Sequence, residues 1–255
     1  MKIFLLTAAL AAILTLPAAA QKKPPISQHL AGSLEASQLG FSGTPPALCS
    51  PCLFYGGDLN PADLNAAGTS NENTLLILGG SSTYAPYTVP SGATEKITGI
   101  LFNIQASANF DPNTASYDIR TGIAPGYGGT SLASGSAAPQ VQPTGRALLG
   151  FTEYTVYVLL PAPLTLTSGE YWFNLTPACT DGATDGSCYV GRFFFSNTTQ
   201  NTNSIVGAAQ PEESMYLNSA FYGISWTNWC DPSLGFNIYQ CRAGSYGLTG
   251  TARRD

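Results

Sequence analysis

Two tryptophans stand three positions apart near the C-terminal end, beside polar side chains, and this stretch has the clearest capacity to bind a ligand. The candidate binding residues are Tyr222, Trp226, Asn228, Trp229 and Asp231. Because residues an odd number of positions apart point to opposite faces of a strand, Trp226 and Trp229 are not both expected to face a core. An exposed aromatic ring beside amide and carboxylate groups can stack on a sugar ring and hydrogen-bond its hydroxyls. Tyrosines of other loops could extend such a face: Tyr84, Tyr87 and Tyr127. The alternative interpretation places both tryptophans in the core.

A second candidate site is a long loop rich in oxygen-bearing side chains, which suits a calcium ion. Its candidate ligands are Asp58, Asn60, Asp63, Asn65 and Glu72, with Asn71 beside them. Calcium takes about six to eight oxygen ligands, often carboxylates mixed with amides. The spacing is not that of an EF-hand, and Asp and Asn are also common in solvated turns. Calcium is one interpretation of this loop, and a solvated loop is the other.

Catalysis has weaker support in the residue types. The single histidine, His29, stands in a low-complexity N-terminal arm, poorly placed to activate a nucleophile, and no G-x-S-x-G motif is present. Glycoside hydrolysis needs only two carboxylates. Glu153 and Glu170 stand on or beside neighbouring strand patterns, so a carboxylate-dependent hydrolase of an extracellular polysaccharide is an alternative function. The structural interpretation makes them an exposed strand position and a turn residue.

Six cysteines, an even number, predict disulfides in an oxidising compartment. Four of them bracket two polar loops, which favours local pairing. The other two form a C-S-P-C motif without the βαβ context of a redox centre and without the ligand spacing of a zinc site, so a structural disulfide is favoured there. The expected pairs are Cys49–Cys52, Cys179–Cys188 and Cys230–Cys241.

The N-terminus predicts export. Lys2 is followed by an apolar run over residues 3–16 and by a small-residue cleavage site at 18–20, so residues 1–20 are expected to be a secretory signal peptide. The run is too short for a comfortable membrane span, and no later stretch is long enough. We therefore expect a secreted protein with no membrane span after cleavage, an N-terminal arm over residues 21–46, and one β-sandwich domain over residues 47–255.

Composition and periodicity both indicate an all-β fold. Only 10% of the residues are charged, glycine numbers 27 and proline 18, and the net charge of −5 argues against a nucleic-acid partner. Runs with period-two alternation recur between turn residues, with no convincing helical periodicity. Pro161 and Pro163 are expected to end one strand, and Ser168-Gly169 to form a turn. The expected strands are Thr74–Leu78, Lys96–Gln105, Ser116–Thr121, Phe151–Leu160, Leu164–Thr167, Glu170–Thr176, Tyr189–Phe195, Ser214–Ile224 and Gly235–Gln240. They predict a two-sheet antiparallel β-sandwich, jelly-roll-like, with disulfide-stapled loops.

Six short phrases are spread over most of the mature chain: F-Y-G-G-D (54–58), Y-D-I-R-T-G (117–122), G-G-T-S-L-A-S-G (128–135), G-F-T-E-Y-T-V (150–156), L-T-S-G-E-Y-W (166–172) and N-S-A-F-Y-G (218–223). With them the chain resembles a group of secreted bacterial β-sandwich proteins, generally uncharacterised, that often carry a PEP-CTERM-type sorting anchor. The resemblance implies a fold and an extracellular role in attachment or matrix, and brings no catalytic residues. No such anchor follows here, which favours free secretion.

These patterns favour a secreted non-enzymatic protein that binds a polysaccharide or cell-surface glycan or forms part of the extracellular matrix. A self-assembling structural subunit is a further alternative, which exposed strand edges would favour. Calcium is the one cofactor that the sequence suggests.

Overall fold

The computed structural model describes residues 46–59, 71–72, 81–148, 150–179, 193–198, 206–208, 210, 215–220, 223–231 and 243–254. Over these ranges the chain forms strands and turns without a helix, which confirms the predicted all-β class. The strands are β1 (Cys52–Tyr55), β2 (Asn71–Glu72), β3 (Ser81–Ala106), β4 (Thr114–Thr121), β5 (Thr130–Ala137), β6 (Gln140–Leu148), β7 (Phe151–Ala178), β8 (Phe193–Phe195), β9 (Asn197–Thr198), β10 (Tyr216–Ser219), β11 (Ile224–Asn228), β12 (Ala243–Gly244) and β13 (Tyr246–Arg254).

Eleven of these strands form one antiparallel sheet. Its main path runs β1-β13-β3-β7-β4-β5, with β6 added to β7, β8 and β10 to β3, β2 to β8, and β11 to β10. Strands β9 and β12 form a separate pair. The antiparallel arrangement confirms that part of the sequence prediction, whereas the division into two sheets with jelly-roll connectivity stays a prediction.

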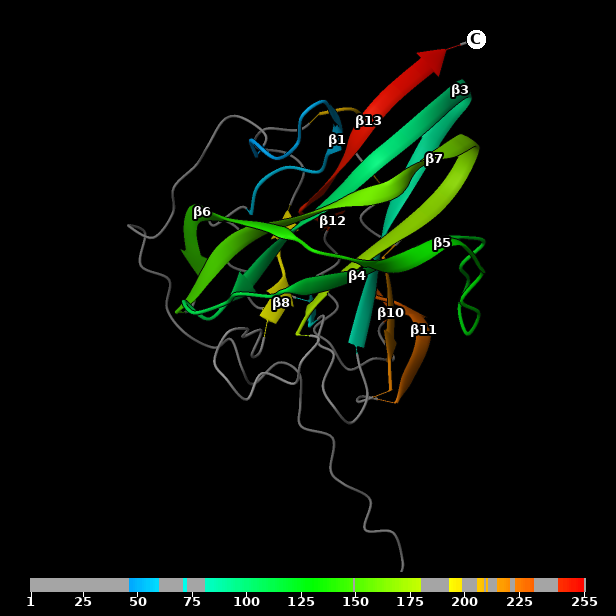
Figure 1. Ribbon diagram of the computed structural model, residues 1–255. Coiled ribbons are helices and arrows are strands. Elements are labelled where there is room, and N and C mark those ends of the chain that lie inside the picture. Colours follow the sequence, from blue (N-terminus) through cyan, green and yellow to red (C-terminus); the bar gives the residue numbers. More distant parts are fainter. Residues whose placement is uncertain are drawn as a thin grey trace, which may run out of the picture.

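Two long strands, β3 and β7, run side by side and bend together, so each has two arms (Figure 1). Residues 85–89 of β3 pair with residues 169–173 of β7, and residues 99–106 pair with residues 152–159. At the bend, the Ser168 hydroxyl donates a hydrogen bond to the Pro90 carbonyl (3.0 Å) and accepts one from the Gly92 N–H (3.1 Å). The bend folds a single hydrogen-bonded sheet back on itself.

A β-bulge at Thr98, within the second arm of β3, keeps the strand directed toward the same core on both sides of the bulge. In β13, consecutive residues Thr249 and Gly250 pair with Gly99 and Ile97, which leaves Thr98 as the additional residue. An additional residue reverses the alternation of faces. Accordingly, the core-facing residues of β3 have odd numbers up to Ile97 and even numbers from Ile100 onward.

The prolines of β7 lie where the ladder between β3 and β7 is interrupted. The expectation that Pro161 and Pro163 end a strand is wrong, because β7 continues to Ala178 and includes all three strands predicted between residues 151 and 176. Residues 160–163 have no register partner on β3. A missing N–H at this irregularity therefore costs no hydrogen bond of that ladder.

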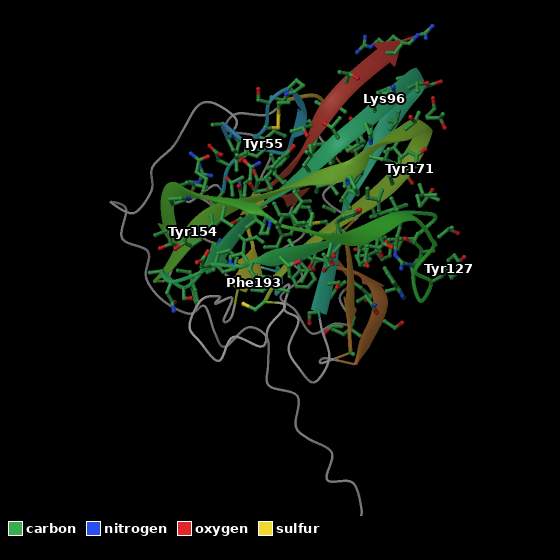
Figure 2. The ribbon with its side chains drawn as sticks, viewed as in Figure 1. Tyr55, Lys96, Tyr127, Tyr154, Tyr171 and Phe193 are labelled. Atoms are coloured by element: carbon green, nitrogen blue, oxygen red, sulfur yellow. A yellow bond between two sulfur atoms is a disulfide. The ribbon has the colours of Figure 1, made fainter. Side chains whose placement is uncertain are left out.

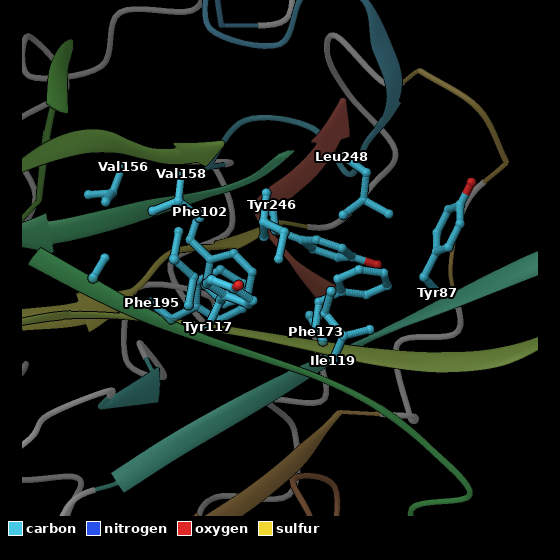
Figure 3. Packing of buried hydrophobic residues seen from close by; sticks show 14 of the residues in the cluster. Tyr87, Phe102, Tyr117, Ile119, Val156, Val158, Phe173, Phe195, Tyr246 and Leu248 are labelled. Carbon is cyan, nitrogen blue, oxygen red and sulfur yellow. The ribbon is translucent and has the colours of Figure 1, made fainter. Parts of the chain in front are cut away.

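The apolar core lies between the two arms and is rich in aromatic rings (Figure 3). The Phe102 and Phe195 rings stack with centroids 4.4 Å apart, and the Phe54 and Tyr246 rings lie 4.9 Å apart. Phe173 joins this cluster from the other arm of the sheet. Because both arms contribute, the bend is what allows one sheet to enclose a core.

Several sequence predictions can be compared with the structure only in part, because some of their residues are not described. The predicted bond Cys49–Cys52 is present, and Cys179 and Cys230 are also disulfide-bonded. Their expected partners lie outside the described residues, as do the signal peptide, residues 21–45 of the arm, and the strands expected at 74–78 and 235–240. The strand expected over Ser214–Ile224 is two strands, β10 and β11. Among the described residues, no helix has the length and apolar character needed to cross a membrane.

Candidate ligand-binding site

Trp226 lies on β11 in a strained backbone conformation with its side chain half-buried. Its φ of 43° falls in the left-handed region, which costs a non-glycine residue about 1–3 kcal/mol and persists only where neighbours fix it. The Gly126 N–H donates a hydrogen bond to the Trp226 carbonyl (2.9 Å). A Cβ at Gly128 would lie 2.4 Å from Cε2 of the Trp226 ring, so the ring packs where only glycine leaves room.

An arginine lies against the Trp226 ring. The Arg120 guanidinium is 4.9 Å from the centre of that ring and 5.8 Å from the centre of the Tyr84 ring. Its Nε donates to Asp118 Oδ2 (2.5 Å), and its Nη1 donates to the Gly128 carbonyl (2.9 Å). Burial alone would lower the pKa of Arg120, but the bond and the charge of Asp118 outweigh it and raise the pKa. The guanidinium therefore stays charged.

Asp118 connects the strands on which this site is built. Besides Arg120, it accepts hydrogen bonds from the Tyr84 hydroxyl (2.9 Å) and from the Ser131 hydroxyl of β5 (2.7 Å). Burial and the Asp118 carboxylate raise the pKa of Tyr84, so this hydroxyl remains a neutral donor at physiological pH. The network joins β3, β4 and β5 beneath the Trp226 ring.

Tyr127 projects from the turn between β4 and β5, at the margin of the molecule (Figure 2). Its side chain is 59% exposed, an unusual degree for a large aromatic residue. The turn is closed by two backbone hydrogen bonds between Ala124 and Tyr127, of 2.9 and 2.8 Å. Because the same turn is bonded to Trp226 through Gly126, the two aromatic residues belong to one rigid unit. We call Tyr127, Trp226, Arg120, Asp118 and Ser131 the aromatic face.

The other candidates from the sequence lie elsewhere or have structural partners. Trp229 is 6% exposed and belongs to the core, so it offers no surface for stacking. The Asn228 side chain accepts a hydrogen bond from the Cys230 N–H (2.7 Å), and Asp231 is half-buried next to it. Tyr222 lies outside the described residues. Tyr87 is buried with its hydroxyl on Glu95 (2.7 Å).

One carboxylate considered for calcium, Asp58, and one considered for hydrolysis, Glu153, lie in the same buried polar network. Asp58 accepts a hydrogen bond from the Tyr55 hydroxyl (2.7 Å) and forms an ion pair with Arg146 (3.1 Å). Arg146 also donates to Glu153, which is fully buried and accepts a second bond from Thr144 (2.8 Å). Burial alone would lower the pKa of Arg146, and the charges of Glu153 and Asp58 raise it.

The same network continues across β3, β7 and the segment before β13. The Asn103 side chain donates to the Tyr55 hydroxyl (2.7 Å) and to the Ser245 hydroxyl (2.8 Å), and accepts from Thr155 (2.7 Å). Burial and the Asp58 carboxylate raise the pKa of Tyr55 well above its usual value. The arrangement pairs these buried side chains with one another through charge and hydrogen bonds, so we interpret the network as structural.

The remaining predicted ligands and carboxylates do not join this network in the described residues. Asn60, Asp63 and Asn65 lie outside those residues, and Glu72 is described only through its backbone in β2. Among the residues that the structure describes, no group of three or more His, Cys, Asp or Glu side chains could hold a metal ion. Glu170 is exposed near the bend, in surroundings unlike those of Glu153.

Sequence reasoning missed the two charged residues of the aromatic face. Asp118 and Arg120 stand two positions apart in the phrase Y-D-I-R, which places both on one face of a strand. That spacing was the available signal for an ion pair. Comparison with known proteins adds no relative, because no protein-family model matches the chain and no curated protein matches it significantly.

Proposed function

We propose that this protein is a secreted, non-enzymatic protein that binds a polysaccharide or cell-surface glycan through the aromatic face. The observation that carries the proposal is the placement of Trp226, held against Gly128 in a strained backbone, next to an exposed tyrosine and a charged arginine. Sugar rings present apolar C–H faces surrounded by hydroxyl groups. Aromatic rings with adjacent hydrogen-bonding side chains match both features.

The extracellular part of the proposal rests on the sequence. The predicted signal peptide, the predicted disulfides and the resemblance to secreted bacterial proteins all favour export and a role in attachment or matrix. A jelly-roll-like sandwich is our interpretation of the sheet that folds back on itself. Such a scaffold presents loops and turns at its margins, where glycan-binding residues are commonly placed.

The hydrolase alternative has less support from the carboxylates. A glycosidase needs one carboxyl group that protonates the leaving group and one that acts as base or nucleophile, both in contact with the substrate. Glu153 is completely buried, and its Oε2 atom accepts hydrogen bonds from Arg146 and Thr144. A substrate could reach it only by displacing this network.

The test is the binding of the mature protein to a panel of polysaccharides by calorimetry, with and without calcium, while released reducing sugar is measured. Tyr127→Ala and Trp226→Ala should each weaken binding by about 5- to 30-fold, because a central aromatic contact contributes about 1–2 kcal/mol. Leu159→Ala is the matched control, since Leu159 is 60% exposed and lies on β7, outside the aromatic face.

Trp226→Ala removes a packed ring, so its melting temperature must be compared with that of the unchanged protein. Tyr127→Ala removes an exposed ring and should leave folding intact, which keeps the test decisive. Binding that survives both substitutions would contradict the proposed face. Sugar release that is lost in Glu153→Gln would instead support the hydrolase.

A further inference from the structure

Within the part of the chain that the structure describes, one edge of the sheet is unpaired over a full strand. Strand β5 ends the main path of the sheet and, among the described residues, pairs only with β4. Its other edge therefore carries main-chain N–H and C=O groups with no ladder partner in the described fold. Most β5 side chains are exposed, including the apolar Leu132 at 42%. Such an edge is a template for pairing with another extended chain.

The other edge strands that the structure describes carry features that discourage pairing. Strand β6 contains Pro143 and has a register irregularity between Pro143 and Ala147. Strand β1 has four residues, and its first residue is held in the bond Cys49–Cys52. Strand β11 is interrupted by the positive φ of Trp226. Natural proteins blunt sheet edges with such prolines, bulges and short strands, and β5 has the fewest of them.

The regular part of β5 is complementary to itself. Residues 133–137 read A-S-G-S-A, a palindrome centred on Gly135. This segment follows the one register shift in the pairing with β4, so it pairs with β4 residues 115–119 without interruption. In an antiparallel pair of two copies related by a two-fold axis at Gly135, alanine meets alanine, serine meets serine and glycine meets glycine.

In such a pair of β5 strands, the apolar face would lie toward the core and the polar face toward solvent. Ala133 and Ala137 pack against the hydrophobic core, and Gly135 lies under the Tyr117 ring, so one face continues the core. Ser134 and Ser136 are exposed and would form cross-strand serine pairs, which can hydrogen-bond. No charged residue occurs between Arg120 and Arg146, so the net charge of −5 is not concentrated at this edge.

We propose that β5 is a homodimer interface, at which two copies of this chain pair antiparallel about a two-fold axis through Gly135. The pairing would add about four to six main-chain hydrogen bonds and continue the sheet from one copy into the next. Only a second copy brings the same palindrome to this edge, which is why we assign it rather than an unrelated peptide. The inference does not depend on glycan binding.

The test uses two double variants at the same exposed positions of the mature protein. Under the proposed axis, position 134 of one copy lies opposite position 136 of the other. Ser134→Lys with Ser136→Lys places two lysine pairs directly opposite each other, which should raise the dimer dissociation constant about tenfold. Ser134→Lys with Ser136→Glu places lysine opposite glutamate and should keep the constant within about threefold of the original.

Sedimentation equilibrium over the widest soluble concentration range gives the dissociation constants, and thermal melting confirms that each variant is folded. Raising the salt concentration should return part of the lost affinity to the double-lysine variant, because the repulsion is screened. A protein that is monomeric throughout overturns the proposal. The proposal is also overturned if neither double variant changes the dimer dissociation constant, or if both raise it equally. The proposed axis requires the two variants to differ, because it places position 134 of one copy opposite position 136 of the other.

Discussion

The buried polar network makes a sharp prediction, because it holds two acidic side chains and one basic one. Arg146 is 4% exposed, and Asp58 and Glu153 are buried still more completely. Arg146→Met keeps much of the side-chain volume but leaves two carboxylates buried without their cation. Breaking a buried ion pair from one side costs about 3–5 kcal/mol, because the remaining charge is uncompensated.

Glu153→Gln should cost much less, although it removes a charge from the same ion pair. Arg146 keeps its pairing with Asp58, so a neutral pair remains. Glu153 Oε1 and Gln105 Oε1 are both buried acceptors without a hydrogen-bond donor, on residues directly opposite each other in the ladder. A glutamine amide at position 153 brings a donor to this pair of acceptors. We therefore expect Glu153→Gln to change the free energy of unfolding by less than about 1 kcal/mol.

Urea unfolding followed by circular dichroism measures both variants. Arg146→Met should lower the midpoint by about 1–3 M for a typical dependence on urea. If Glu153→Gln costs as much as Arg146→Met, the charge argument is refuted.

Two further predictions concern single residues of the fold. Glu95 accepts a hydrogen bond from Tyr87, and burial raises the pKa of the Glu95 carboxyl group. The contribution of Glu95 to the free energy of unfolding is therefore complete below about pH 4.3, the usual pKa of a glutamate, and is lost as the pH rises through the pKa in the folded state. Glu95→Gln should therefore be more stable than the original protein near pH 7 and equal to it at low pH, as measured by urea unfolding at both pH values. Gly250→Ala should cost about 1–3 kcal/mol, because its φ is 154° and a Cβ would lie 2.0 Å from the Lys96 carbonyl oxygen. Gly92→Ala is its control in the same denaturation assay, with a positive φ but open space around the Cβ, and should cost less.

The sequence predicted the elements that depend on local alternation. The runs Lys96–Gln105 and Phe151–Leu160 lie within β3 and β7 and pair with each other, because apolar residues at every second position specify a strand and its buried face. The bond Cys49–Cys52 was also predictable, since its two residues are close in the chain. Each of these depends on residues within a few positions of one another.

Other strands escaped prediction because their alternation is faint. Strand β5 reads T-S-L-A-S-G-S-A, and its inward side chains are alanine and glycine, too small to give an apolar signal. The joining of three predicted strands into β7 depends on the missing register partners at residues 160–163. That irregularity is a property of the pair of strands, and β7 alone does not show it.

The aromatic face was only half predictable, and its most informative local signal was its glycines. Trp226 was identified by type, but nothing near it in the chain indicates that it would adopt a positive φ. The conformation of Trp226 is held by the phrase G-Y-G-G at residues 126–129. There the Gly126 N–H donates a hydrogen bond to the Trp226 carbonyl, and Gly128 leaves room for the Trp226 ring. A glycine in a turn often marks a position that another group approaches closely. Here that group is the Trp226 ring, which reaches the turn because β11 pairs with β10 and β10 pairs with β3. The local signal for the aromatic face thus lay in the turn between β4 and β5, and the Trp226 ring that completes this face came from a distant part of the chain.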